Sequence, residues 1–276
     1  MKDFHVHESH SGDAVEATVS GYLEAAENLR MDEICFTAHL ITTGQYTRFS
    51  IQPHLIPEYI EEIERAQVST NVRLRVGLEV DYFPEEERRI GSILNEYSFD
   101  FILGSLHFPR GFNMGSREGF ADFSGDRKME DVLSDFYCLW KEAVESKLFD
   151  AMAHPDYFRR AICQSGLPLP TFEKYGIEVL EAIDSMKSCG VGFEINSAGF
   201  RHNIDDFYPI EGFLKAAQQS GIETVTIGSD SHSVDQLGIG LEEAVKRLRD
   251  TGYSNVSTFF GRKTQRIGLD ELERQK

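Results

Sequence analysis

The sequence predicts an α/β fold, a seven-stranded (β/α)7 barrel formed by a single domain that covers residues 1–276. Seven short apolar segments alternate with longer amphipathic segments, and this order is typical of a parallel sheet wound by right-handed crossovers. No linker rich in Pro, Gly or Ser divides the chain, which favours one closed or nearly closed barrel. A doubly wound open sheet is the alternative that the same alternation allows.

The seven predicted strands are short, rich in apolar and β-branched residues, and bordered by polar residues or glycine. In chain order they are Asp3–Val6, Glu33–Thr37, Arg73–Glu79, Asp100–Ser105, Asp150–Ala153, Gly192–Asn196 and Thr224–Gly228.

Helices are predicted between the strands, where apolar residues recur at helical spacing and proline or glutamate often stands at the start. They are Val15–Leu29, Pro57–Val68, Pro84–Tyr97, Met129–Lys147, Phe172–Ser188, Pro209–Ser220 and Gly240–Asp250. The segment Pro109–Arg127 has no periodicity and is rich in Gly, Phe, Arg and Asp. It is predicted to be a long loop, and such loops in compact domains are often functional.

The composition argues against several classes of function. The 46 Asp and Glu residues outnumber the 28 Lys and Arg residues, and the net charge of −18 disfavours long nucleic acid as a partner. No apolar run reaches the roughly 20 residues that span a bilayer, and the first residues lack the apolar region of a secretory signal. The four cysteines form no Cys-x-x-Cys pair, so we expect reduced thiols and a cytoplasmic protein. The oligomeric state stays open.

Residues of the types that bind metals stand where the predicted strands end. In a parallel barrel these ends converge on one face, the face on which barrel active sites form. Imidazole and carboxylate groups are ligands for Zn, Mn and Fe. A metal site is therefore predicted at this face from His5, His7, His39, Glu79, His107, His154, Asp230 and His232.

Each motif taken alone is weaker evidence for a metal site than all of them together. His5 and His7 lie two residues apart on a strand, so both rings face the same side, but surface or core histidines explain many such pairs. Asp230 follows a strand, and a helix N-cap would also explain an aspartate at this position. Metal-binding residue types at six of seven strand ends favour a metal site over these alternatives.

Seven segments carry a resemblance to a known family, namely FHVHESHSGDA, FTAHL, GLEVDYF, DFILGSLHF, AHPDYFRR, FEINSAGFRH and IGSDSH. They resemble the PHP (polymerase and histidinol phosphatase) superfamily, and most of all its histidinol-phosphate phosphatase branch. The first and last segments occur across the superfamily. GLEVDY, AHPD followed by two arginines, and EINSAGFR followed by YP are more specific to the phosphatases. The resemblance implies a distorted seven-stranded barrel with a trinuclear metal site.

The resemblance also implies how the ligands divide among three divalent transition metal ions, which would be Zn, Mn or Fe. The first ion would be held by His5, His7, Glu79 and Asp230. Glu79 would bridge to a second ion, held also by His107 and His154. The third ion would be held by Asp13, His39 and His232. The family has His or Asp at the place of Asp13, and His10 lies near enough to compete for this role.

The chain departs from the family in two places. The second motif is commonly Thr-Asp-His, whereas Ala38 precedes His39 here and offers no outer hydrogen bond. The loop Phe108–Asp126 also lacks the Trp and Asp that family members often carry. Substrate recognition is therefore the part of the resemblance that transfers least directly.

The implied activity is hydrolysis of a small phosphomonoester by a metal-bound hydroxide, with L-histidinol phosphate of histidine biosynthesis as the expected substrate. Arginine suits a phosphate because of its paired donors, although a surface salt bridge is an equal explanation for any one arginine. The candidate substrate-binding residues are Arg159, Arg160, Asn196 and Arg201, and the possible substrate-loop residues are Glu118 and Asp122.

Two other functions remain as alternatives. The first is a phosphoesterase of the same superfamily that acts on another small phosphomonoester or a nucleotide. The second is a metal-binding domain without catalytic activity, which the full set of ligands disfavours.

Overall fold

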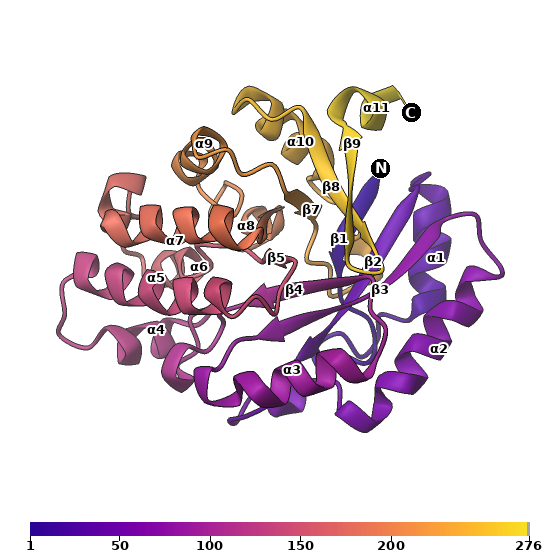
Figure 1. The fold of residues 1–276 in the computed structure, drawn as a ribbon, viewed down its shortest axis with the longest axis horizontal. Coiled ribbons are helices and arrows are strands. Elements are labelled where there is room, and N and C mark those ends of the chain that lie inside the picture. The colour runs from indigo at the N-terminus through magenta and orange to yellow at the C-terminus, as the bar shows by residue number, and fades with distance from the viewer. Residues whose placement is uncertain (275–276) are drawn as a thin grey trace.

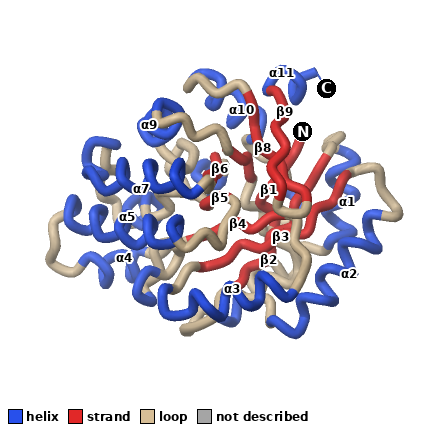
Figure 2. The backbone as a smooth tube through the Cα atoms, in the orientation of Figure 1, coloured by secondary structure: helices blue, strands red, loops and turns tan. Residues whose placement is uncertain are grey.

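The structure is a computed structural model that describes residues 1–274. Its centre is a parallel sheet whose strands follow one another in chain order (Figures 1 and 2). The strands are β1 (Lys2–Val6), β2 (Glu33–Leu40), β3 (Arg73–Asp81), β4 (Phe101–Ser105), β5 (Ala151–Met152), β6 (Gly192–Asn196) and β7 (Val225–Gly228). All seven predicted strands are confirmed.

The sheet closes between β1 and the segment that follows β7. The amide of Asp230 donates to the carbonyl of His5 at 2.9 Å, and the amide of His7 donates to the carbonyl of Ser231 at 2.8 Å. Val6 forms a parallel bridge with Ser231. The first strand therefore has a partner on each side. The sheet is a nearly closed barrel, and the open-sheet alternative is wrong.

Helices surround the strands (Figure 2). The longer ones are α1 (Val19–Asn28), α2 (Ile56–Gln67), α3 (Glu87–Glu96), α5 (Met129–Glu145), α7 (Gly176–Cys189), α9 (Glu211–Gln219) and α10 (Leu241–Asp250). The shorter ones are α4 (Arg117–Ser124), α6 (Arg159–Gln164), α8 (Ala198–Arg201) and α11 (Leu269–Arg274). Helix α1 begins later than predicted because the hydroxyl of Thr18 caps it by accepting from the amide of Gly21 at 3.1 Å.

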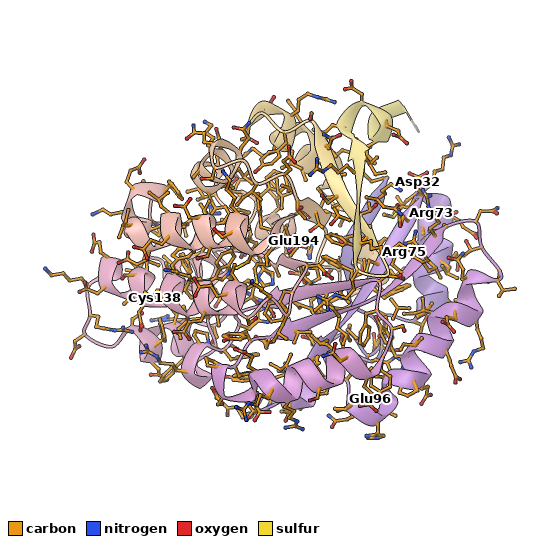
Figure 3. All side chains as sticks on the ribbon, viewed as in Figure 1. Asp32, Arg73, Arg75, Glu96, Cys138 and Glu194 are labelled. Atoms are coloured by element: carbon orange, nitrogen blue, oxygen red, sulfur yellow. The ribbon has the colours of Figure 1, made fainter. Side chains whose placement is uncertain are left out.

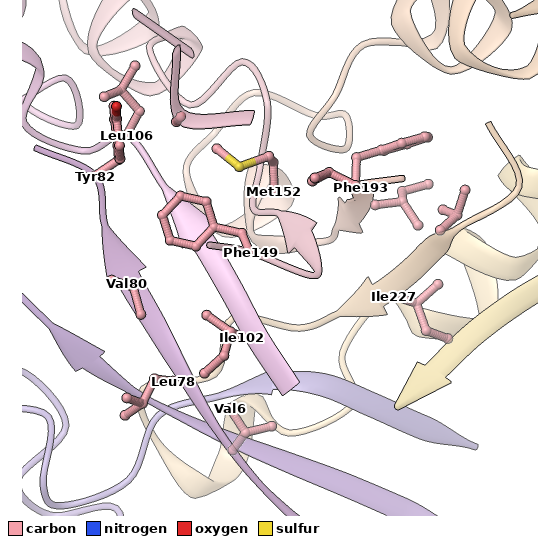
Figure 4. Close-up of a cluster of buried hydrophobic side chains, with 14 of the residues drawn as sticks. Val6, Leu78, Val80, Tyr82, Ile102, Leu106, Phe149, Met152, Phe193 and Ile227 are labelled. Atoms are coloured by element: carbon pink, nitrogen blue, oxygen red, sulfur yellow. The ribbon is translucent and has the colours of Figure 1, made fainter. Parts of the chain in front are cut away.

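The main hydrophobic core lies between the outer face of the barrel and the helices. Leu78 and Val80 of β3 pack there with Ile102 of β4 (Figure 4). Side chains alternate along a strand, so Glu79, which stands between Leu78 and Val80, turns into the barrel. The apolar positions that hold the helices therefore also fix the direction of the residues that face inward.

A hairpin of β8 (Asn255–Phe260) and β9 (Lys263–Gly268) packs where strands β4 and β5 begin, and the sequence analysis did not predict these strands. The ring of Phe259 lies 4.8 Å from that of Phe101. The guanidinium of Arg262 pairs with Asp150 at 3.0 Å, and its amide donates to the carbonyl of Asp100 at 2.9 Å. The hairpin thus packs against the amino-terminal end of the barrel, and its strands pair only with each other.

The segment predicted as a long loop, Pro109–Arg127, contains helix α4. The hydroxyl of Ser116 accepts from the amide of Gly119 at 3.1 Å and caps this helix, whose inner face buries Phe120 and Phe123. With so few turns, its apolar periodicity is too brief to recognise in the sequence. Within residues 1–274, no helix is long and apolar enough to cross a membrane.

Candidate metal centre

The nine predicted metal ligands converge at the carboxyl ends of the strands. His5, His39 and Glu79 lie on β1, β2 and β3 themselves, and the other six lie in the segments that follow the strands. Their neighbouring nitrogen and oxygen atoms form several groups that could each hold an ion. Residues separated by more than two hundred positions are therefore close neighbours in the fold.

The first group contains His5, His7, Glu79 and Asp230. The Nε2 atoms of His5 and His7 lie 3.0 Å apart, and each lies within 3.4 Å of Oε2 of Glu79. Oδ1 of Asp230 is 3.7 Å from His5 and 3.6 Å from His7. Ligand atoms that share an ion at about 2.0–2.2 Å have separations of this order.

The second group lies on the other oxygen of Glu79. Oε1 of Glu79 is 2.9 Å from Nε2 of His154 and 3.5 Å from Nε2 of His107, and these two nitrogens are 3.1 Å apart. One carboxylate thus faces two separate histidine pairs with its two oxygens, which is the arrangement a bridging ligand requires.

The third group is more open to solvent. Oδ2 of Asp13 lies 3.4 Å from Nε2 of His39 and 3.5 Å from Nε2 of His232. The other ring nitrogen of His39, Nδ1, lies 3.0 Å from Oε2 of Glu79. His10 does not join this group, because its Nδ1 atom faces Oε2 of Glu8 at 2.9 Å.

The buried atoms of the centre suit a bound cation. Oε2 of Glu79 and Nδ1 of His39 are buried and lie 3.0 Å from each other, but within the described residues neither atom makes a contact with hydrogen-bond geometry. Such orphaned atoms are costly unless a ligand satisfies them. An ion shared by the surrounding imidazole and carboxylate groups would do so, and the donor set is one that Zn, Mn and Fe accept.

The pKa values show how strongly these groups act on one another. Burial acts to lower the pKa of His5, but the carboxylates of Glu194 and Asp230 outweigh it and hold the pKa well above its usual value. Burial and the nearby His39 lower the pKa of His7 to about 4. Burial acts to raise the pKa of Glu79, but the adjacent imidazoles hold it well below its usual range. Metal binding would therefore displace a proton from an imidazole whose pKa is raised, such as that of His5, whereas the ring of His7 is already neutral.

Outer carboxylates orient the ligands. Oδ2 of Asp81 lies 3.0 Å from Nδ1 of His107, and Oε1 of Glu194 lies 2.8 Å from Nδ1 of His5. Such partners fix the tautomer and the direction of a metal-binding ring. The sequence analysis missed the role of Glu194. The available signal was its position between two buried apolar residues of β6, because alternation along the strand directs the side chain of Glu194 into the barrel. Figure 3 labels Glu194 near the middle of the molecule.

Asn196 does not line the cavity. Its Nδ2 atom donates to Oε2 of Glu194 at 2.9 Å and to Oδ2 of Asp230 at 3.4 Å. Its Oδ1 atom accepts from the amide of Ala198 at 2.8 Å. Asn196 therefore connects two carboxylates behind the metal ligands and does not contact the space a substrate would occupy.

Gly228 is expected to tolerate no side chain, because a Cβ atom there would lie 2.0 Å from Oε1 of Glu194 and 2.5 Å from Cβ of His5. The variant Gly228→Ala would displace both residues. We expect it to weaken metal affinity by about 10- to 100-fold, the usual effect of losing an outer partner. Competition with a chelator of known affinity measures this change.

Gly268→Ala is the matched control, since nothing lies within 4 Å of the new Cβ atom there. Unchanged metal affinity in Gly228→Ala would contradict the role assigned to Glu194.

A cavity of about 600 Å³ opens onto the centre. Arg160 and Arg201 line it, as the sequence predicted, and so does His202, which the sequence analysis left out. Nδ1 of His202 lies 3.1 Å from the hydroxyl of Tyr208. Burial, with Arg160 nearby, lowers the pKa of His202 to about 3, so this ring is neutral.

Besides Asn196, three predicted substrate residues do not line the cavity. Arg159 is 3% exposed, and its guanidinium donates to the carbonyl of Phe207 at 2.7 Å and pairs with Asp206 at 3.0 Å. Glu118 and Asp122 are exposed on helix α4 and are not among the lining residues. Glu118 and Asp122 miss the cavity because helix α4 turns its apolar face inward and its charges outward, and Arg159 misses it because it is buried against Asp206.

Fold and site together define a parallel (β/α) barrel with a cluster of His and carboxylate ligands at the carboxyl ends of its strands. The model of the PHP domain family matches residues 3–198. The chain belongs to the PHP family.

The curated relatives with similar sequences are named histidinol-phosphatases. The probable histidinol-phosphatase of Deinococcus radiodurans is 31% identical over 272 residues, which cover 95% of this chain and 98% of that protein. The histidinol-phosphatase of Lactococcus lactis is 24% identical, with 95% of each chain covered. Among solved structures, histidinol phosphate phosphatase from Lactococcus lactis complexed with zinc, L-histidinol and phosphate has a TM-score of 0.82. It is 22% identical and covers 96% of this chain and 98% of that chain, so it shows the shared fold.

Proposed function

We propose that this chain is a metal-dependent phosphomonoesterase that hydrolyses L-histidinol phosphate to L-histidinol and phosphate. The observation that carries the proposal is the position of Glu79, whose two oxygens face different histidine pairs at the base of a cavity lined by two arginines. The names of the relatives and the zinc, histidinol and phosphate of the Lactococcus lactis structure support the substrate.

The proposal includes three divalent ions, one in each group of ligands, with zinc favoured by the related structure and Mn or Fe compatible with the donor set. Bound ions would lower the pKa of coordinated water and neutralise phosphoryl charge. We also propose that residues 1–276 form one barrel domain. Cytoplasmic location is part of the proposal, and the four free cysteines suit a reducing compartment.

The two arginines are placed to bind phosphoryl oxygens. Nη2 of Arg201 donates to the carbonyls of Ser229 and Asp230, each at 2.7 Å, while its Nη1 atom is buried and has no hydrogen-bond partner among residues 1–274. Nη1 of Arg160 donates to the hydroxyl of Tyr157 at 2.7 Å, which directs the guanidinium. Charged donors held in this way recognise a phosphate at fixed geometry.

Arg160→Ala is expected to raise KM for every phosphate ester tested by about 10- to 100-fold, because a hydrogen bond to a charged group is worth about 1.5–3 kcal/mol. Steady-state kinetics on at least three esters measures this. Arg110→Ala is the control, since Arg110 pairs with Asp135 on the surface and does not line the cavity. An unchanged KM in Arg160→Ala would remove Arg160 from the phosphate site.

The proposed function is tested with purified protein of measured metal content and a panel of phosphomonoesters that includes L-histidinol phosphate. We expect the highest kcat/KM for L-histidinol phosphate. A higher value for a nucleotide or another small ester would establish the alternative phosphoesterase function. Failure to hydrolyse any ester by the fully metal-loaded protein would indicate a metal-binding domain.

A further inference from the structure

The cavity has an apolar side that neither the metal ligands nor the arginines form. Ile41, Phe49 and Phe108 line it, and they come from the segments after β2 and β4. Arg160 and Arg201 come from helices α6 and α8, which follow β5 and β6. A charged phosphoryl group makes no favourable polar contact with apolar side chains. This surface is therefore available to the carbon skeleton of a substrate.

The aromatic rings on this side form an ordered stack. The ring of Tyr46 lies 4.1 Å from that of Phe108 with 11° between their planes, and 6.5 Å from that of Phe49 with 17°. Phe108 is only 8% exposed. The carbonyl of Phe49 accepts from the amide of Gly12 at 2.9 Å, which ties this segment to the first loop. Rings already held in place lose little freedom when a planar ligand stacks on them.

The stack adjoins the candidate metal centre. The rings of Phe108 and His107 lie 5.8 Å apart. Ile41 follows His39 by two residues, and the carbonyl of His39 accepts from the amide of Ile51 at 2.8 Å. A short phosphomonoester with its phosphoryl group at the metal centre would therefore have its other end within reach of these rings.

The charges of the cavity favour recognition by ring faces. Among the described residues that line it, the carboxylates are Asp13 and Asp230, and both belong to the candidate metal centre. Glu118 and Asp122, the possible substrate-loop residues, do not line this cavity. An aromatic face stacks with a neutral imidazole and attracts a protonated one.

We propose that Phe49 and Phe108, backed by Tyr46, form a stacking site for a planar heteroaromatic ring carried by the phosphomonoester substrate. The site selects ring-bearing esters over aliphatic ones. This inference rests on the proposed phosphatase function for the phosphate end of the substrate, whereas binding of the ring is measurable without turnover.

The test compares L-histidinol phosphate with 2-aminoethyl phosphate, an ester that keeps an amino group but has no ring. In the metal-loaded protein, Phe108→Leu and Phe49→Leu are each expected to lower the ratio of the two kcat/KM values by roughly five- to tenfold. Phe108→Tyr keeps a ring and should retain the ratio. L-Histidinol, which lacks the phosphate, should bind the two leucine variants more weakly by the same factor in calorimetry.

Phe83→Leu is the matched control. Phe83 packs in the same hydrophobic cluster as Phe108 but does not line the cavity, so it should change stability and leave the ratio unchanged. Phe49 is only half-buried, so replacing it with leucine should cost little folding stability. An unchanged ratio in both leucine variants, or the same change in Phe83→Leu, would overturn the stacking site. If the wild type hydrolysed neither ester, the proposed function would fail, and L-histidinol binding alone would decide the stacking site.

Discussion

Dialysis against a strong chelator is expected to lower turnover of phosphomonoesters by at least about a thousandfold, since metal ions supply several kcal/mol of transition-state stabilisation in such sites. The nine side chains of the candidate centre would act as ligands of the ions, and within the described residues Oε2 of Glu79 and Nδ1 of His39 are buried without a hydrogen bond of good geometry. The loss should be reversible, and Zn, Mn and Fe added separately should restore different fractions of the activity.

Elemental analysis and kcat measured on the same sample test this prediction. Circular dichroism of the metal-free protein is the control, because unfolding would also abolish turnover. Full activity in protein shown to be free of metal would refute the metal-dependent mechanism.

Glu79→Gln is expected to remove ions from two of the three groups and to lower kcat/KM by about a thousandfold or more, a loss of roughly 4 kcal/mol of transition-state stabilisation. A neutral amide is a poor ligand and balances neither of two dications. Glu79 is fully buried, and its two oxygens face His5 and His7 on one side and His107 and His154 on the other.

Glu33→Gln is the matched control for Glu79→Gln. Glu33 is equally buried, but it lies at the start of β2, where it pairs with Lys2 at 2.8 Å and Arg75 at 2.6 Å. Its loss should lower the melting temperature, because it leaves buried charges unpaired, and should leave metal content at the wild-type value. Wild-type metal content in Glu79→Gln would show that Glu79 does not bridge two ions.

The sequence was most informative where a repeating pattern had one structural explanation. Seven buried strands separated by amphipathic helices admit few topologies, so the parallel barrel followed from the pattern alone. The inward direction of His5, His7 and Glu79 followed from alternation along the strands. The stretches Pro109–Arg127 and Asn255–Gly268 were not recognised as helix and hairpin. Each is short, and its buried apolar residues, such as Phe120 and Phe259, are covered by contacts with distant segments.

The substrate side of the cavity was predicted less well than the metal side. The two adjacent arginines look alike in the sequence, yet Arg160 lines the cavity while Arg159 is buried against Asp206. Residues one apart on a helix do not share a face, and which of them faces the cavity depends on how helix α6 packs.

By itself, the sequence determined the class of fold, the face of the barrel that carries the site and the identity of the candidate ligands. These depend on the periods of strands and helices, which are local properties of the chain. Only the tertiary structure decided that both oxygens of Glu79 face histidine pairs, that Glu194 lies against His5, and that Phe49 and Phe108 line the cavity whereas Glu118 and Asp122 do not. Each of these depends on the packing of side chains that are far apart in the sequence. A local sequence pattern does not predict such contacts.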